Sequence, residues 1–397
     1  MIDESLYEKR EQTLAKHEIL RKYLEGFAHT VGSAWPSITY IDCFSGPWNV
    51  RSSDLKDSSF AIALQELRKA RESLDRRGRK IALRCLFLER DAEAYQQLEE
   101  FSRSAHDVEV KALNLEFEKS INEIVQFVKS GGNSFPFIFI DPTGWTGFAM
   151  TTIAPLLQLR PVEVLVNFMT GHITRFLHSP QSKIQSSFES LFGSTEFRPL
   201  LEGIEGIDLE DQAVALYSEN LRRRGNFDYS SKAVVLNPEK NRSHFHLVYA
   251  TRNSEGVAVF KEAERRAMSI MESARANAQR RRRVERTRQF EMPLSRPTRQ
   301  SAYFESLRKR YLNRARDAVK TLLSEEVRVQ YDRAWARALS FQLVWESDLK
   351  EWIQDWQQQP APAKGSLTIE GLGDRERTPK RNRNHFLVWH IGPRLEA

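Results

Sequence analysis

Cysteine is scarce in this chain, with only Cys43 and Cys85 among 397 residues. Two cysteines within predicted buried strands supply neither a disulfide framework nor a cysteine zinc site, so both are expected to be small core residues. Long apolar runs are also missing: no stretch of about 18 uncharged apolar residues occurs, which argues against a membrane-spanning helix. The opening residues, MIDESLYEKR, lack the order of a signal peptide. We therefore expect a cytoplasmic protein with no membrane partner.

Charged residues are abundant but nearly balanced, with 60 Lys and Arg against 53 Asp and Glu and a formal net charge of +7. An excess this small says little about partners until the charges are located along the chain. Hydrophobic residues make up 40% of the chain, which is ordinary for a globular protein. The length exceeds what one hydrophobic core usually organises, so we expect two domains or one domain with a large appendage.

Short apolar runs typical of buried strands alternate with helical patterns over the first 255 residues. An amphipathic helix over 14–27 opens the chain, and five apolar runs follow: ITYIDCF, LRCLFLERD, VEVKAL, FPFIFIDP and VEVLVNFM. Strands that are apolar on both faces and alternate with helices predict a parallel sheet covered on both sides. Right-handed crossovers favour a doubly wound arrangement.

Two later apolar runs have the spacing of a hairpin. SKAVVLN and HFHLVYATR are separated by the polar residues 238–243, which is too short a connection for a crossover helix. The expected fold class is therefore α/β, with a Rossmann-like parallel sheet that ends in an antiparallel hairpin. This is the strand inventory of class I S-adenosylmethionine-dependent methyltransferases, whereas a plain dinucleotide-binding domain would lack the hairpin.

The sequence predicts three segments. Residues 1–255 form the methyltransferase-like Rossmann domain with its N-terminal helix, and 256–298 form a basic helical linker. Residues 299–397 show helices, then FQLVW as a strand, another helix, and two strands, SLTIEGL and NHFLVWHI. This order suggests a winged-helix-like C-terminal domain.

Candidate ligand-binding residues follow the first predicted strand, because open α/β sheets bind ligands at the carboxyl ends of their strands, near the point where strand order reverses. Asp42 could accept hydrogen bonds from a cofactor amine, and Gly46 permits close approach of the backbone, with Phe44 and Ser45 beside it. Asp42 could equally cap a turn.

The second and third strands end in further polar residues. Glu89, followed by Arg90, is placed to bind both ribose hydroxyls of a cofactor, although it could also be a solvated strand end. Asn114 and Glu116 could accept from the exocyclic amine of a purine, and Glu116 could instead be a first-turn helix carboxylate. Together these positions predict S-adenosylmethionine as the cofactor.

The fourth strand ends in DPTGW, which suggests the substrate side. Asp141 and the carbonyl of Pro142 could accept from an amine nucleophile, and Trp145 could stack on a flat substrate. Amino-methyltransferases carry Asp/Asn-Pro-Pro-aromatic here, whereas this chain has Thr143 and Gly144 before its aromatic residue, so a plain turn is the alternative. Neither cysteine is placed to attack a pyrimidine ring, which disfavours carbon-5 cytosine methylation. No histidine has metal-ligand spacing, so no metal is predicted.

A set of motifs resembles a known family. KHEILRKYLEGF, YIDCFSGPW, FLERDAEAY, NLEF, FIDPTGW and VLVNFMTGHITRF occur in order up to residue 180 and resemble the three-Cys-motif partner (TcmP) proteins. The resemblance implies a methyltransferase-like fold and a genetic partnership with a radical-type enzyme that bears three cysteines. The chain departs from the family at Trp48, where members often have Gly, and at Leu115-Glu116, where they have Gly-Asp.

Two basic zones predict contact with nucleic acid through its phosphates. Between Arg275 and Arg288 the chain has seven arginines, and DRERTPKRNRN lies between the last two predicted strands. A solvated linker, or arginines that pair with acids on the same helix, is the alternative. The residues expected to bind are Arg280, Arg281, Arg282, Arg283, Arg286, Arg381 and Arg383.

Three functional hypotheses remain open at this point. The first is an S-adenosylmethionine-dependent methyltransferase that acts on or with nucleic acid, together with the three-cysteine partner that the resemblance implies. The second is a catalytically inactive subunit that binds nucleic acid and presents it to that partner. The third is a methyltransferase of a protein or small molecule.

Overall fold

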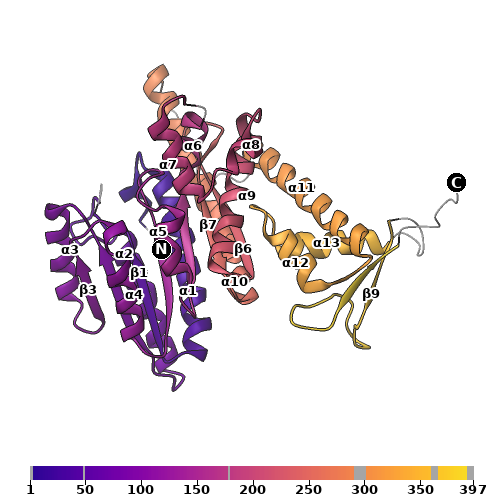
Figure 1. The fold of residues 1–397 in the computed structure, drawn as a ribbon, viewed down its shortest axis with the longest axis horizontal. Coiled ribbons are helices and arrows are strands. Elements are labelled where there is room, and N and C mark those ends of the chain that lie inside the picture. The colour runs from indigo at the N-terminus through magenta and orange to yellow at the C-terminus, as the bar shows by residue number, and fades with distance from the viewer. Residues whose placement is uncertain (1–2, 48–49, 178, 290–300, 359–364, 391–397) are drawn as a thin grey trace. The chain divides into compact units, whose positions relative to one another are not determined.

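The computed structural model divides the chain into two units, Met1–Thr298 and Arg299–Ala397 (Figure 1). The structure describes residues 3–47, 50–177, 179–289, 301–358 and 365–390. Trp48 and residues 290–298 of the predicted linker lie outside the described residues. None of the described helices is both long and apolar enough to cross a membrane.

A seven-stranded sheet organises the first unit, in the order β3-β2-β1-β4-β5-β7-β6. Strands β1 to β5 pair in parallel, and β7 is inserted between β5 and β6 and runs antiparallel to both. This topology confirms the predicted methyltransferase-type sheet with its terminal hairpin. The strands are β1 (Ser37–Asp42), β2 (Ala82–Leu88), β3 (Glu109–Leu113), β4 (Ser134–Ile140), β5 (Glu163–Phe168), β6 (Tyr229–Leu236) and β7 (Ser243–Thr251).

Helices cover both faces of this sheet (Figure 1). Polar N-caps begin several of them: the Asp91 carboxylate accepts from the N–H of Ala94, and the Ser58 hydroxyl accepts from Ala61. The helices are α1 (Glu11–Ala34), α2 (Ser59–Asp75), α3 (Ala92–Ser104), α4 (Ile121–Ser130), α5 (Met150–Leu157), α6 (Thr170–Phe176), α7 (Ser182–Phe192), α8 (Phe197–Leu201), α9 (Gly206–Gly225) and α10 (Ser254–Thr287), with short 3₁₀ turns η1 (Glu4–Tyr7) and η2 (Phe117–Lys119).

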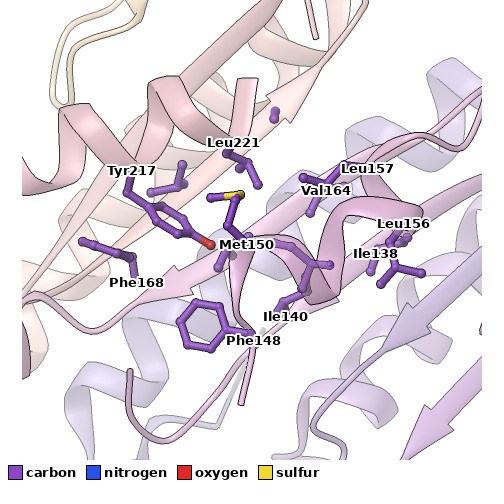
Figure 2. Close-up of a cluster of buried hydrophobic side chains, with 14 of the residues drawn as sticks. Ile138, Ile140, Phe148, Met150, Leu156, Leu157, Val164, Phe168, Tyr217 and Leu221 are labelled. Carbon is purple, nitrogen blue, oxygen red and sulfur yellow. The ribbon is translucent and has the colours of Figure 1, made fainter. Parts of the chain in front are cut away.

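One face of the sheet packs against α4, α5 and α9. Side chains of β4 and β5 meet the helices in a fully buried cluster that Figure 2 shows. Phe168 stacks on Tyr217 of α9 with ring centroids 4.4 Å apart. Burial of each large apolar side chain contributes roughly 1.5–3 kcal/mol. The cluster includes Ile138, Ile140, Phe148, Met150, Leu156, Leu157, Val164, Phe168, Tyr217 and Leu221.

The other face packs against α1, α2 and α10. Tyr23 of α1 lies over Phe137 with ring centroids 4.9 Å apart, and Phe260 of α10 stacks on Tyr249 at the same spacing. Helices α1 and α10 pack closely at Gly26, where a Cβ atom would lie 2.7 Å from Val259. Helix α10 therefore belongs to the first unit, whereas the sequence suggested a separate linker from residue 256.

A buried carboxylate ties α1 to the sheet. Glu163, at the start of β5, accepts from the Tyr23 hydroxyl and, at 2.7 Å, from the Thr251 hydroxyl. Burial raises the pKa of Glu163 above its ordinary value. The two hydroxyl donors compensate a group that would otherwise be costly to bury.

The second unit contains α11 (Ala302–Glu326), β8 (Arg328–Gln330), α12 (Tyr331–Leu339), α13 (Glu346–Gln357), β9 (Leu367–Glu370) and β10 (Phe386–Trp389). Its strands form an antiparallel sheet in the order β8-β10-β9. The prediction of a strand at FQLVW was wrong, because Leu343 takes a positive φ of 56° there and ends any extended run. Leu343 and Val344 are buried in the turn before α13, and the third strand is β8 instead.

Replacement of Tyr23 by Phe tests the anchor of α1. Tyr23→Phe removes one donor to the buried Glu163, so we expect a loss of about 1–3 kcal/mol in the free energy of unfolding, measured by urea denaturation of the full chain. Tyr40→Phe is the matched control, because the Tyr40 hydroxyl makes only a 3.3 Å contact with Asp42. Equal effects of the two substitutions would contradict this role of Glu163.

Candidate functional site

A cavity of about 760 Å³ opens at the carboxyl ends of the parallel strands. Residues that follow β1, β2, β3, β4 and β5 line it, and the start of α1 and the first residues of β7 complete the wall. This volume lies within the roughly 300–1,000 Å³ typical of cofactor and small-molecule sites. The cavity also spans the point where strand order reverses between β1 and β4, as expected for an open α/β sheet.

Most of the residues predicted from sequence meet at this cavity. The lining includes Phe44, Gly46, Glu89, Arg90, Glu116, Asp141 and Pro142. Four others are not part of the lining: Asp42, Ser45, Asn114 and Trp145. The hydrogen bonds and packing contacts of these four residues indicate a supporting role for each.

Asp42 and Ser45 build the turn after β1. The buried Asp42 carboxylate accepts from the Ser59 hydroxyl at 2.6 Å and from the N–H of Phe44 at 3.2 Å. The Ser45 hydroxyl donates to the Asp42 carbonyl at 2.8 Å, and the Ser45 N–H donates to the Leu88 carbonyl at 2.7 Å. Both residues thus support the loop beneath the cavity, and the direct cofactor contact expected of them stays a prediction.

Glu89 and Asn114 are coupled at the ends of β2 and β3. Glu89 is 5% exposed and one of its carboxylate oxygens accepts from the N–H of Asp91 at 2.7 Å. The Asn114 amide donates to the carbonyls of Glu89 and Arg90, at 2.9 and 3.2 Å. Asn114 therefore holds the loop that presents Glu89 through its Nδ2 atom, and acceptance from a purine amine by its Oδ1 atom stays a prediction.

Glu116 is exposed at the rim of the cavity. It pairs with Lys119 at 2.8 Å, and this hydrogen bond and charge lower the pKa of Glu116. Glu116 directly precedes η2 and Lys119 ends it, and such a pair is typical of a solvated helix start. Glu116 nevertheless lines the cavity, so both roles that the sequence suggested are open to it.

Asp141 is bonded to two residues that the sequence analysis did not identify, Asn167 and Lys16. One oxygen accepts from the Asn167 amide at 2.7 Å, and the other forms an ion pair with Lys16 of α1. The side chains of Lys16 and Asp141 are only 13% and 12% exposed. A signal was present for Asn167, since it is the one amide within the apolar run VEVLVNFM. Lys16 could not be found this way, because its contact spans 125 residues.

Trp145 is half-buried and is not part of the cavity lining. Its indole N–H donates to Ser187 at 2.9 Å, and its ring packs on Phe176 and Phe188 with centroids 5.1 and 5.8 Å apart. These partners come from α6 and α7. Helices α6 and α7 therefore hold the indole ring, and its stacking on a substrate stays a prediction.

The N-terminal segment closes one side of the cavity. Arg10 pairs with the buried Asp57, whose carboxylate also accepts from the N–H groups of Arg51 and Ser52, at 3.0 and 3.2 Å. The Tyr7 hydroxyl and His17 Nδ1 are 3.0 Å apart, and burial lowers the pKa of His17 well below its ordinary value. Neutral His17 and the paired Arg10 make this wall a fixed part of the site.

The first predicted basic zone is partly neutralised. Consecutive residues of a helix are about 100° apart, so Arg280–Arg283 cannot share one face of α10. Arg281 pairs with Glu11 and, at 3.7 Å, with Glu8, while Arg282 pairs with Glu239 at 3.3 Å. Arg283 and Arg286 are exposed at the end of the helix.

In the second unit the two arginines predicted to bind nucleic acid differ in exposure and in their contacts. Arg381 packs over the Trp335 ring at 4.7 Å and lies 3.7 Å from Glu346. Arg383 is exposed in the connection between β9 and β10. Within the described residues, no group of three or more His, Cys, Asp or Glu side chains is arranged to hold a metal ion.

Comparisons with known proteins add little to this geometry. No family model and no curated protein sequence matches the chain. A solved Legionella pneumophila protein of the DUF519 family is similar over 63% of this chain and 88% of its own, with 10% identity and a TM-score of 0.36. Loganic acid methyltransferase, solved with SAH, is similar over 70% of this chain and 91% of its own, with 11% identity and a TM-score of 0.29. Likenesses this distant carry no information about activity or substrate.

The buried Asp42 predicts a specific pH dependence of stability. Burial, with added repulsion from Asp141, raises the pKa of Asp42 to about 6, against about 3.9 in an unfolded chain. Between these values the folded state binds the extra proton, so this group's contribution falls as pH rises from 4 to 6 and is lowest above 6. We expect the stability of Asp42→Asn relative to the natural protein to increase over this range by up to about 3 kcal/mol.

Urea denaturation of both proteins at several pH values between 4 and 7.5 measures this difference. Titrating groups that do not interact with Asp42 are common to the two proteins and cancel. A difference that does not change with pH would contradict the buried, proton-binding state of Asp42.

Proposed function

We propose that this chain is an S-adenosylmethionine-dependent methyltransferase-like protein that acts on nucleic acid. The observation that carries the proposal is the shared cavity, in which Glu89 after β2 and Asp141 after β4 lie on either side of the strand-order reversal. An acid after the second strand suits ribose hydroxyls, and an acid after the fourth suits a methyl acceptor. The cofactor side and the substrate side of a methyl-transfer site would thus line the same cavity.

The cofactor half is formed by the loops after β1, β2 and β3. Gly46 allows close approach of the backbone, Glu89 would accept from the ribose hydroxyls, and Glu116 or Arg90 would contact the base from the rim. Asp42, Ser45 and Asn114 hold these loops in place through backbone hydrogen bonds. S-adenosylmethionine supplies an electrophilic methyl group on a sulfonium when it is bound.

The substrate half is formed by the ends of β4 and β5 with α1. Asp141 and the carbonyl of Pro142 would accept from the methyl acceptor and orient its lone pair, and Lys16 and Asn167 would keep the carboxylate in position. Catalysis here consists of orientation and electrostatic stabilisation, with no covalent bond to the enzyme.

Exposed arginines support nucleic acid as the substrate. In the second unit, Arg375, Arg377 and Arg383 are exposed in the β9–β10 connection, while the exposed side of α13 carries Glu351 and Asp355. The element order α11-β8-α12-α13-β9-β10 supports a winged-helix module, and the charges favour phosphate contact through the connection, not through α13. Arg283 and Arg286 offer a second contact in the first unit.

A substrate-presenting subunit without catalysis is the second candidate. The ion pair of Lys16 with Asp141 favours it, because the ammonium occupies an acceptor that a substrate amine would use. The motifs shared with the three-Cys-motif partner family support a radical-type protein with three cysteines as the partner of either form.

Cofactor binding tests the proposal directly. We expect S-adenosylhomocysteine to bind the full chain in isothermal titration calorimetry, and Glu89→Ala to weaken binding at least tenfold, about 1.4 kcal/mol, because the acceptor for the ribose hydroxyls is removed. Glu93→Ala, an exposed acid in the first turn of α3, serves as the control and should not change affinity. Absence of binding by the natural protein would refute the enzyme and favour the presenting subunit.

Salt dependence tests the nucleic-acid contact. For Arg283→Ala/Arg286→Ala, and separately for Arg375→Ala/Arg377→Ala/Arg383→Ala, we expect weaker binding to duplex DNA or RNA. The slope of log affinity against log salt should become shallower by roughly 0.9 for each phosphate that the variant no longer neutralises. Arg265→Ala/Arg266→Ala removes two equally basic residues that pair with Glu262, and should change the slope little. Unchanged slopes in both sets would argue against nucleic acid.

A further inference from the structure

The Asn237 side chain fixes which ring nitrogen of His244 carries the proton. Asn237 Oδ1 accepts from the N–H groups of Glu239 and Lys240, at 3.1 and 2.9 Å, so the amide cannot be flipped. Its Nδ2 atom therefore faces His244 Nδ1, 3.3 Å away, and donates to it. A ring nitrogen that accepts carries no proton, so neutral His244 is protonated on Nε2.

The Nε2–H group of His244 is an unused donor at the cavity. Among the described residues it has no hydrogen-bond partner, and it is not one of the fully buried atoms that lack a partner, so its surface is accessible. His244 also lines the cavity. Burial, with repulsion from Arg242, His172 and Lys16, lowers the pKa of His244 below its ordinary value. The ring is therefore neutral at neutral pH and offers one donor to a ligand.

The register of β7 places this donor in the substrate half of the cavity. Phe168, the last residue of β5, pairs with His246, so His244 lies two residues beyond the end of β5. Strand β7 is four steps from β2, or about 19 Å across the sheet at about 4.8 Å per strand. Lys16 Nζ lies 5.9 Å from the ring centroid of Phe245, the residue after His244. The donor thus belongs with the ion pair at the end of β4, away from the cofactor half.

The charges around His244 favour an anionic acceptor. The turn between β6 and β7 carries Lys240 and Arg242, both exposed. Its one acid, Glu239, pairs with Arg282 of α10 at 3.3 Å. Burial raises the pKa of Glu210, which interacts with Arg242, to about 7, so this acid opposes the positive charge only in part. An anionic oxygen forms the stronger hydrogen bond with an N–H donor and is attracted by the two exposed cations.

We propose that His244 Nε2–H binds a phosphate oxygen of the nucleic-acid strand that carries the methyl acceptor, while Lys240 and Arg242 hold the same strand at the rim. The inference rests on the nucleic-acid part of the proposed function and adds the contact that positions the strand at the cavity. The pair of Glu239 with Arg282 joins the turn to the end of α10, so the strand can continue toward the exposed arginines there. His244 fixes the backbone beside the target nucleotide and does not touch the reacting atoms.

Nuclear magnetic resonance of the full chain with ¹⁵N-labelled histidine tests the donor. The His244 signals are identified by their absence in His244→Gln. We expect the proton on Nε2 at neutral pH, and we expect its signals to shift when cytidine or adenosine 3′,5′-bisphosphate is added with S-adenosylhomocysteine. The parent nucleosides, which lack phosphate, should leave these signals unchanged.

Fluorescence anisotropy with short single-stranded RNA and DNA tests the contact in the whole ligand. His244→Ala should weaken binding about tenfold, because a hydrogen bond to a charged group is lost, while the affinity for S-adenosylhomocysteine stays within about twofold. His244→Gln, whose amide N–H can take the place of Nε2–H, should recover most of the affinity. His106→Ala is the matched control, because His106 is exposed before β3 and is not part of the cavity lining.

Several outcomes would overturn the inference. A proton on Nδ1, or equal shifts with nucleosides and bisphosphates, would refute the phosphate contact. A shift with a short acidic peptide but not with the bisphosphates would assign the donor to a carboxylate ligand instead. Unchanged RNA and DNA affinity in His244→Ala would also refute it.

Failure of the proposed function is read separately. If the natural protein does not bind S-adenosylhomocysteine but binds RNA or DNA through His244, methyl transfer fails and the phosphate contact stands. If it binds S-adenosylhomocysteine but neither RNA nor DNA, the nucleic-acid substrate and this inference both fail, and the cofactor site stands.

Discussion

Parallel pairing of β1 with β2 and β4, and of β4 with β5, brings the carboxyl ends of all these strands to one edge of the sheet. Strands β1 and β5 are buried along their whole length, and β2 and β4 over all but one residue each, so polar side chains are tolerated only at strand ends or where they have a hydrogen-bond partner. Glu89, Asp141 and Asn167 meet in one cavity for this reason. Their chemistry depends on the register of the strands more than on any single contact.

Helix α1 contributes two polar contacts to the sheet, one of them at the cavity. Tyr23 binds the buried Glu163 at the start of β5, and Lys16, seven residues earlier, pairs with Asp141 just after β4. Seven residues of helix span about 10.5 Å, so one helix is anchored at two places along the same face of the sheet. Because these anchors are polar and buried, the depth of the cavity and the position of Asp141 are coupled to the packing of α1.

The sequence predicts the sheet well, because long apolar runs and their spacing report directly on buried strands. It also places Glu89 and Asp141, which lie at the ends of those runs. Short polar residues beside them are less predictable, since Asp, Ser and Asn readily bond nearby backbone groups. Pairs that join distant segments leave no local pattern at all. The sequence offered the turn role of Asp42 as one of two alternatives, whereas the residues whose contacts came only from the structure are Ser45, Asn114, Trp145, Lys16 and Arg281.

The central claim is that the ends of β1, β2 and β4 form one ligand site. Hydrogen–deuterium exchange of the full chain, with and without saturating S-adenosylhomocysteine, tests it most directly. We predict slower exchange in peptides that cover residues 43–46, 88–90 and 141–144, and no change in the second unit. Unchanged exchange in all three segments, or protection confined to other parts of the first unit, would contradict it.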